Sequence, residues 1–254
     1  MVLAIDVGNT NIVLGGLEND RVVFTERLST DTVKTSLEYA ILFNVALDLH
    51  KIDKSSVEGT IVSSVVPPIT PVIRTAIRKI VNKKTIVLGP GTKTGLSIRI
   101  DDPSSVGADL VAGAVGAVAK YEPPLAVIDM GTATTISIVD RDRNYLGGSI
   151  MPGVRLSLSS LVSGASMLGG ISLEVPKHAI GRSTVGAMRS GIILGHAAML
   201  DGLIDHMEEE VGESLTVVAT GGLASRVIPV CRHEIILDDT LLLTGLKVIY
   251  DKNR

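Results

Sequence analysis

The sequence is poor in cysteine and in aromatic residues: it has one cysteine, Cys231, no tryptophan, two phenylalanines and four tyrosines. A single cysteine excludes an intramolecular disulfide and a cysteine-based metal cluster, which fits a reducing cytoplasm. The 24 basic and 27 acidic residues are mixed along the chain, and no basic stripe stands out. Without such a stripe, and with few aromatic side chains to stack on bases, we expect no nucleic-acid binding.

Long hydrophobic runs are also missing, although 45% of the 254 residues are hydrophobic. No run approaches the roughly 20 apolar residues that a membrane-spanning helix needs, so we expect no membrane insertion. No basic region precedes the apolar residues Val2–Ile5, and we therefore expect no signal peptide. A chain of this length can bury one large core or two smaller ones. Its 26 glycines favour close backbone packing around a small molecule.

The N-terminal stretch Met1–Leu17 is typical of a β-hairpin. An apolar run, Val2–Ile5, ends at Asp6. A polar turn follows at Gly8–Asn11, and Ile12–Leu14 is apolar again. A carboxylate at the mouth of such a turn can hold a hydrated Mg²⁺, and the N–H groups of the turn can meet phosphate oxygens. An ordinary hairpin with an Asx-type turn would give the same pattern, so this stretch alone leaves both interpretations open.

The same pattern recurs far along the chain, at Ala126–Val139. The matched pairs are Asp6 with Asp129, Gly8 with Gly131, and Asn9–Asn11 with Thr132–Thr134. A repeat at this separation indicates a duplicated lobe rather than a stacked repeat array. In this respect the chain resembles the superfamily of acetate and sugar kinases, heat-shock ATPases and actin. The resemblance implies an α/β fold of two similar ribonuclease H-like lobes, a duplicated actin-like ATPase fold with a central nucleotide cleft, which we place at 1–118 and 119–254.

Helical spacing and capping signals predict a helix over Ser36–Leu49, with Thr35 and Glu38 forming a capping box. In the first lobe we also expect strands at 21–28, 59–66 and 83–88 and a helix at 70–82. In the second lobe we expect helices at 154–168 and 187–207, a strand at 215–219 and a helix from 223. A last helix, 239–250, could pack on either lobe. His196 and His206 do not share a face of their helix, so we interpret them as structural or solvated.

Two further features have both a structural and a functional interpretation. Asp109 stands at the start of a helix of small residues, Leu110–Tyr121, which could lie close against another backbone. The helix dipole would keep a carboxylate there ionised, whether it caps the helix or acts in catalysis. Thr220–Gly222 follows a strand and would let a base or ribose approach the backbone, although a tight strand-to-helix turn gives the same pattern.

Eight motifs in order along the chain resemble the type III pantothenate kinase family. They are DVGNTN at Asp6–Asn11, SSVVP at Ser63–Pro67, GPGTKTGL at Gly89–Leu96, VGAD at Val106–Asp109, DMGTATT at Asp129–Thr135, GGSIMPG at Gly147–Gly153, IGRST at Ile180–Thr184 and TGG at Thr220–Gly222. The resemblance implies ATP-dependent phosphorylation of the primary hydroxyl of pantothenate, the first step of coenzyme A synthesis. It also implies a homodimer.

The resemblance also implies a role for individual residues. The ATP phosphates, with Mg²⁺ bound through them at Asp6, would be held by Asp6, Val7, Gly8, Asn9, Thr10, Asn11, Ile12 and Val13. Further contacts with ATP would come from Thr132, Gly221 and Gly222. Asp129 would bind a monovalent cation, K⁺ or NH₄⁺, and Asp109 would be the general base. Pantothenate would contact Ile100, Gly107, Ala108, Asp109, Leu110 and Thr184.

Two residues depart from the family pattern, both on the acceptor side. Leu110 stands where the family usually has an arginine, and Ile100 stands where it usually has an aromatic residue. The missing arginine removes a candidate partner for an anionic group, and Arg99, Arg155 or Arg182 could replace it. Two alternatives therefore stay open: a kinase of the same fold with a different small hydroxyl acceptor, and a nucleotide-binding regulatory paralogue.

Overall fold

The computed structural model describes residues 1–19 and 21–254, which form two compact units. Unit 1 contains residues 1–97, 101–120 and 240–254, and unit 2 contains 98–100 and 121–239. Each unit is built on one mixed β-sheet. Within the described part of the chain, no helix is long and apolar enough to cross a membrane.

The sheet of unit 1 has the strand order β3-β2-β1-β4-β5. Its strands are β1 Val2–Val7, β2 Asn11–Glu18, β3 Arg21–Ser29, β4 Gly59–Ser64 and β5 Thr85–Val87. The first three strands are antiparallel neighbours, while β4 and β5 run parallel to β1. The predicted hairpin is confirmed, because β1 and β2 pair from Val2–Leu17 up to Val7–Ile12.

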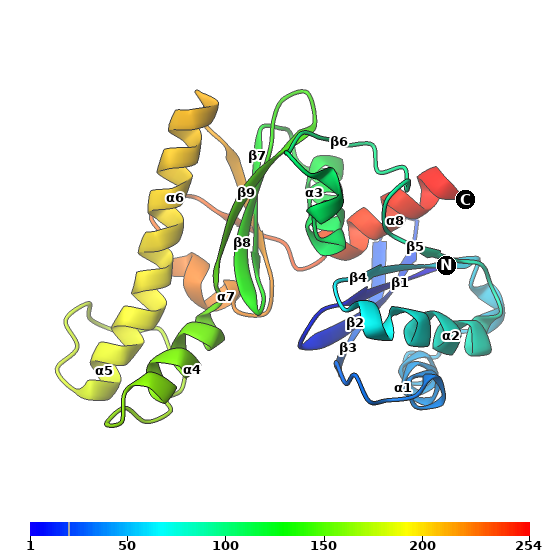
Figure 1. Ribbon diagram of the computed structural model, residues 1–254, viewed down its shortest axis with the longest axis horizontal. Helices are drawn as coiled ribbons and strands as arrows, with labels where there is room; N and C mark the ends of the chain where they lie inside the picture. Colours follow the sequence, from blue (N-terminus) through cyan, green and yellow to red (C-terminus); the bar gives the residue numbers. More distant parts are fainter. Residues whose placement is uncertain (20) are drawn as a thin grey trace. The chain divides into compact units, whose positions relative to one another are not determined.

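One face of this sheet is covered by α1, Ser36–Leu49, and α2, Thr70–Val81 (Figure 1). The core between them and the strands contains the large buried side chains of Tyr39 and Phe43. The predicted helix over Ser36–Leu49 is confirmed, and so is its capping box: Glu38 N–H donates to Thr35 Oγ1, and Thr35 N–H donates to Glu38 Oε2. Both signals are local, which is why the sequence alone located this helix.

Two further helices of unit 1, α3 Ala108–Lys120 and α8 Leu241–Asn253, cross at glycines. A Cβ atom at Gly245 would lie 1.8 Å from the carbonyl oxygen of Ala112, and one at Gly116 would lie 1.9 Å from that of Leu241. The expectation that the small-residue helix lies close against another backbone is therefore confirmed, and α8 supplies that backbone. The predicted division at 118/119 groups this last helix with the second lobe, but its packing on α3 puts it in unit 1.

The sheet of unit 2 has the order β11-β10-β7-β8-β9-β6. Its strands are β6 Ser97–Ile98, β7 Leu125–Met130, β8 Ala133–Val139, β9 Asn144–Pro152, β10 Thr216–Thr220 and β11 Ile236–Leu237. Read from the other edge, β9-β8-β7-β10-β11 repeats the order and the strand directions of unit 1. This repetition is what the duplicated lobe predicts; β6 is an additional strand.

The helices of unit 2 are α4 Val154–Gly164, α5 Thr184–Arg189, α6 Gly195–Val211 and α7 Ala224–Val227. Its core lies where α6 and α7 meet the sheet, with Ile193, Leu200 and Val227 fully buried. The predicted single helix at 187–207 is interrupted by a π-helical turn, Ser190–Leu194. The sequence did not indicate this turn, because an inserted π turn leaves the apolar spacing on either side intact. The helix predicted at 154–168 ends at Gly164.

Candidate active site

In unit 1, Asp6 lies at the end of β1, beside a tight polar turn. Gly8 N–H donates to the carbonyl oxygen of Asn11 at 3.0 Å, and Thr30 Oγ1–H donates to the carbonyl oxygen of Gly8 at 2.6 Å. These bonds fix the turn from inside the unit, while the side chains of Asn9–Asn11 are exposed. A half-buried carboxylate beside exposed amide and hydroxyl groups is an arrangement that can receive phosphates and a hydrated cation.

Asp129 occupies the equivalent position in unit 2, but its hairpin is shorter. Asp6 pairs with Val13 across the first hairpin, whereas Asp129 pairs with Thr135 across the second. Gly131 N–H accordingly donates to the carbonyl oxygen of Ala133, two residues on. The proposed match of Thr134 with Asn11 is therefore wrong by one residue: Ala133 takes the place of Asn11, and Thr134 pairs with Met130 and is fully buried.

Asp129 also has hydroxyl residues on both neighbouring strands. Its partners in register are Thr135 on β8 and Thr220 on β10, so the three side chains share one face of the sheet. Thr135 Oγ1 is buried and has no hydrogen-bond partner among the described residues. A carboxylate flanked by hydroxyls is a set of oxygen donors that fits a hard cation. Nowhere in residues 1–19 and 21–254 do three His, Cys, Asp or Glu side chains converge on a metal position.

Gly221 brings the loop after β10 against β7. Its φ is +102°, and a Cβ atom there would lie 2.6 Å from Met130 N and 2.7 Å from Asp129 Oδ1. Only glycine fits such a close approach in this backbone conformation. Gly221 thus places bare backbone next to the carboxylate of Asp129.

Asp109 lies in the first turn of α3, in unit 1, and is half-buried. Burial raises its pKa above the ordinary value, while the N–H group of Leu110, 2.8 Å from Oδ1, partly opposes that rise. Gly107 leaves space for this carboxylate, since a Cβ atom there would lie 2.4 Å from Asp109 Oδ1. A carboxylate that binds a proton more readily than usual is suited to general-base work.

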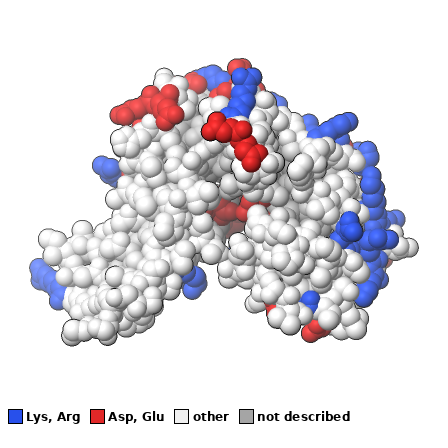
Figure 2. All heavy atoms as spheres, in the orientation of Figure 1, with Lys and Arg blue, Asp and Glu red and all other residues white. Residues whose placement is uncertain are grey.

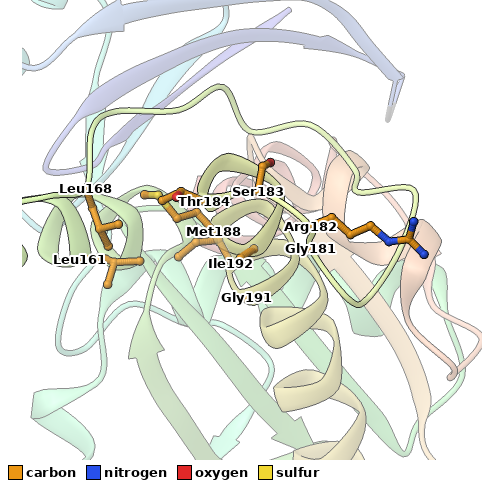
Figure 3. Close-up of a pocket in the computed structure, with 10 residues that line it drawn as sticks. Leu161, Leu168, Gly181, Arg182, Ser183, Thr184, Met188, Gly191 and Ile192 are labelled. Carbon is orange, nitrogen blue, oxygen red and sulfur yellow. The ribbon is translucent and has the colours of Figure 1, made fainter.

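Thr184 lies in a cavity of unit 2 with a volume of about 910 Å³ (Figure 3). The lining is mostly apolar and includes Leu161, Leu168, Met188 and Ile192. Arg182 also lines it, but its guanidinium group extends away from these apolar side chains. The π-helical turn contributes Gly191 and Ile192 to the wall, which is a part of the cavity that sequence periodicity could not reveal.

Each unit therefore holds part of the predicted set. Unit 1 holds the Asp6–Val13 hairpin and Gly107–Leu110. Unit 2 holds Asp129, Thr132, Gly221, Gly222, Ile100 and Thr184. Ile100 is half-buried and lies against the backbone of Gly147, where a Cβ atom would be 3.5 Å from Ile100 Cγ2. Sequence reasoning assigned no role to Ser63, a fully buried neighbour of Asp6, although it lies within one of the recognised motifs.

The chain is similar to known proteins along its whole length. A family model described as type III pantothenate kinase matches residues 2–206. A type III pantothenate kinase of Exiguobacterium sp. (strain AT1b) is 44% identical over 254 residues, and one of Exiguobacterium sibiricum is 42% identical. Each comparison covers 100% of both chains.

Solved structures support the fold. A Campylobacter jejuni protein described as a Baf family transcriptional activator has a TM-score of 0.64 at 19% identity, covering 99% of this chain and 98% of that one. Component A of the Acidaminococcus fermentans (R)-2-hydroxyglutaryl-CoA dehydratase has a TM-score of 0.59 at 15% identity, covering 100% and 99%. At these identities the likeness is one of fold alone, and with the two repeated sheets it shows a duplicated actin-like ATPase fold.

Proposed function

Because the chain belongs to the type III pantothenate kinase family, we propose that it transfers the γ-phosphoryl group of ATP to the primary hydroxyl of pantothenate, the first step of coenzyme A synthesis. The observation that carries this proposal is the pair of carboxylate hairpins on repeated sheets, at Asp6 and Asp129. Phosphoryl transfer depends mainly on positioning the reactants and on neutralising the charge of the phosphates. Hairpins that bind phosphates and cations can do both.

On the donor side, the hairpin Asp6–Val13 would hold the ATP phosphates, with Asp6 toward a hydrated Mg²⁺. The exposed turn Asn9–Asn11 and the half-buried Asp6 carboxylate support this role. Thr132, Gly221 and Gly222 would contact the nucleotide from unit 2. Asp129, with Thr135 and Thr220 beside it, would hold K⁺ or NH₄⁺. The two cations would supply positive charge next to the transferred phosphoryl group.

On the acceptor side, Asp109 would take the proton of the pantothenate hydroxyl. The hydroxyl oxygen then forms a bond to the γ-phosphorus as the bond to the ADP oxygen breaks, and ADP leaves. The raised pKa of Asp109 supports this role, because it makes the carboxylate a better proton acceptor. Gly107, Ala108, Leu110, Ile100 and Thr184 would line the acceptor site.

The surface of the α4–α5 region supports a homodimer. Figure 2 shows few charged side chains over this part of the molecule. Large apolar side chains are exposed here, among them Met167 at 93% and Ile180 at 83%. Apolar patches of this kind mark protein–protein contacts. We place the dimer in the cytoplasm, in keeping with the single half-buried cysteine.

If this surface forms the dimer, the double substitution Met167→Asp/Ile180→Asp should convert the protein to a monomer, because two charges would then be desolvated in the interface. Light scattering after size-exclusion chromatography would measure the mass. Replacing Val33, which is 87% exposed in unit 1, with Asp is the matched control and should leave the mass unchanged. A double variant that keeps the dimeric mass would rule out this face.

Activity is tested by ATP consumption with and without pantothenate, in K⁺ and then in Na⁺. We expect turnover that requires both pantothenate and K⁺. ATP binding without pantothenate turnover in either salt would refute the proposal. Because Leu110 and Ile100 alter the acceptor side, other small hydroxyl compounds would then be screened as acceptors. A nucleotide-binding regulatory role would be tested only after that screen.

Gly221→Ala should weaken ATP binding at least tenfold, because the new methyl group must push the loop away from Met130 N and Asp129. Calorimetric titration with ATP would measure the loss. Gly212→Ala is the matched control: Gly212 also has a positive φ, +82°, but nothing lies within 4 Å of its Cβ position. The control should lose a little stability and keep its ATP affinity. Equal affinity in both variants would contradict contact between Gly221 and the nucleotide.

A further inference from the structure

The hydroxyl group of Ser63, near the end of β4, has no hydrogen-bond partner among the described residues. The residue is fully buried. An unpaired buried hydroxyl destabilises the fold, and alanine at this position would avoid that cost. The next residue, Ser64, is satisfied: Thr70 Oγ1–H and Val66 N–H donate to its Oγ at 2.7 and 3.2 Å. The hydroxyl group of Ser64 thus stabilises the turn after β4, while that of Ser63 makes no hydrogen bond within the described part of the chain.

The position of Ser63 points to a ligand. Parallel pairing of β1 and β4 puts Ser63 directly beside Asp6, and side chains in register lie on the same face of a sheet. On the other side of Asp6, β2 offers only the apolar Val13. Ser63 is therefore the hydroxyl group that the sheet places next to this carboxylate.

Unit 2 repeats this juxtaposition independently. Asp129 on β7 is in register with Thr220 on β10, the strand equivalent to β4. Thr220 is also a buried hydroxyl residue at the end of its strand. A carboxylate with a buried hydroxyl on the adjacent parallel strand is thus a feature of both copies of the fold, rather than an accident of packing at one position.

We propose that Ser63 is a positioning residue for the magnesium ion: its Oγ accepts a hydrogen bond from a water molecule of the ion's hydration shell beside Asp6. Mg²⁺ keeps several of its waters when protein carboxylates bind it. Such waters donate hydrogen bonds, so a buried hydroxyl that makes no hydrogen bond to the protein can be satisfied by one of them. The inference rests on the proposed role of Asp6 and adds the residue that orients the hydrated ion.

The test is the affinity of Mn²⁺, a spectroscopic substitute for Mg²⁺, measured by electron paramagnetic resonance in the presence of ADP. Ser63→Ala should weaken Mn²⁺ binding about tenfold, as is usual when a hydrogen-bond partner of a metal's ligands is lost. The Mg²⁺ concentration for half-maximal activity should rise by a similar factor, with the KM for pantothenate unchanged. Ser63→Cys keeps the volume but accepts hydrogen bonds weakly, and should show the same defect if Ser63→Ala fails to fold.

Ser64→Ala is the matched control. It removes the bonds of the turn, so it should lower the melting temperature and leave Mn²⁺ affinity unchanged. Unchanged Mn²⁺ affinity in both Ser63 variants would overturn the proposal and make Ser63 a small packing residue. If the wild-type protein lacks pantothenate turnover but Ser63→Ala still weakens Mn²⁺ binding, the proposed acceptor is wrong and the role of Ser63 stands.

Discussion

The variant Asp109→Asn should lose pantothenate-dependent ATP turnover by a factor of about 10²–10⁴, the usual contribution of a general base. Asparagine has nearly the same shape as aspartate but cannot take the hydroxyl proton. Asp109 lies in the first turn of α3, where the backbone is set by the helix rather than by this side chain. ATP affinity should therefore stay at the wild-type level, since the loss concerns the chemical step.

The same variant should be at least as stable as the wild-type protein at neutral pH. Burial raises the pKa of Asp109 in the folded state above the ordinary 3.8, so the folded protein binds this proton more tightly than the unfolded chain. Stability from this group is present at low pH and is lost as the pH rises through the raised pKa. At neutral pH the ionised, desolvated carboxylate destabilises the folded state, and Asp109→Asn removes this charge.

Thermal unfolding at several pH values and the pH profile of kcat/KM measure both effects. Wild-type kcat/KM should fall as the pH drops through the raised pKa, because the base must be ionised to accept a proton. Asp53→Asn is a control whose stability should change in the opposite direction. Hydrogen bonds from Ser55 lower the pKa of Asp53, so loss of this carboxylate should reduce the stability of the protein above that pKa. Turnover should stay unchanged. Substantial turnover by Asp109→Asn would exclude this residue as the base.

Features set by local chemistry were predictable from the sequence. The capping box located α1 to the residue, and the apolar run ending at Asp6 located the first hairpin. The repeat at Asp129 predicted the duplicated sheets, because each copy contains its own strands and turn. Asp109 was predicted in the first turn of α3 because the run of small residues that follows it was itself predicted to be a helix.

Features set by pairing between distant segments were not predictable. The length of the second hairpin depends on the register of Asp129 with Thr135, which no local residue pattern encodes. Strand β11 has two exposed residues and exists only because it pairs with β10. The role inferred for Ser63 likewise depends on the alignment of β4 with β1, so the motif that contains it gave no hint of a contact with Asp6.

A large loss of stability should come from Gly245→Ala. A Cβ atom at this position would lie 1.8 Å from the Ala112 carbonyl oxygen and 2.8 Å from Gly116 N, and both are backbone atoms that cannot rotate aside. The helices α8 and α3 would have to separate, at a cost of about 3 kcal/mol, the upper end of the usual range for overpacking. For a chain of this size that lowers the melting temperature by roughly 6–12 °C.

Gly202→Ala in α6 separates this steric effect from the general preference of helices for alanine. Nothing lies within 4 Å of a Cβ atom at Gly202, so that variant should gain a few tenths of a kcal/mol or more from helix propensity. Calorimetry on the two variants should therefore give melting temperatures that move in opposite directions. Because α3 carries Asp109, Gly245→Ala should also have a lower kcat, even when it is assayed at a temperature well below its melting temperature. Gly202→Ala should keep the wild-type kcat. A Gly245→Ala protein as stable as the wild type would show that the crossing of α3 and α8 tolerates separation, and that the position of Asp109 does not depend on it.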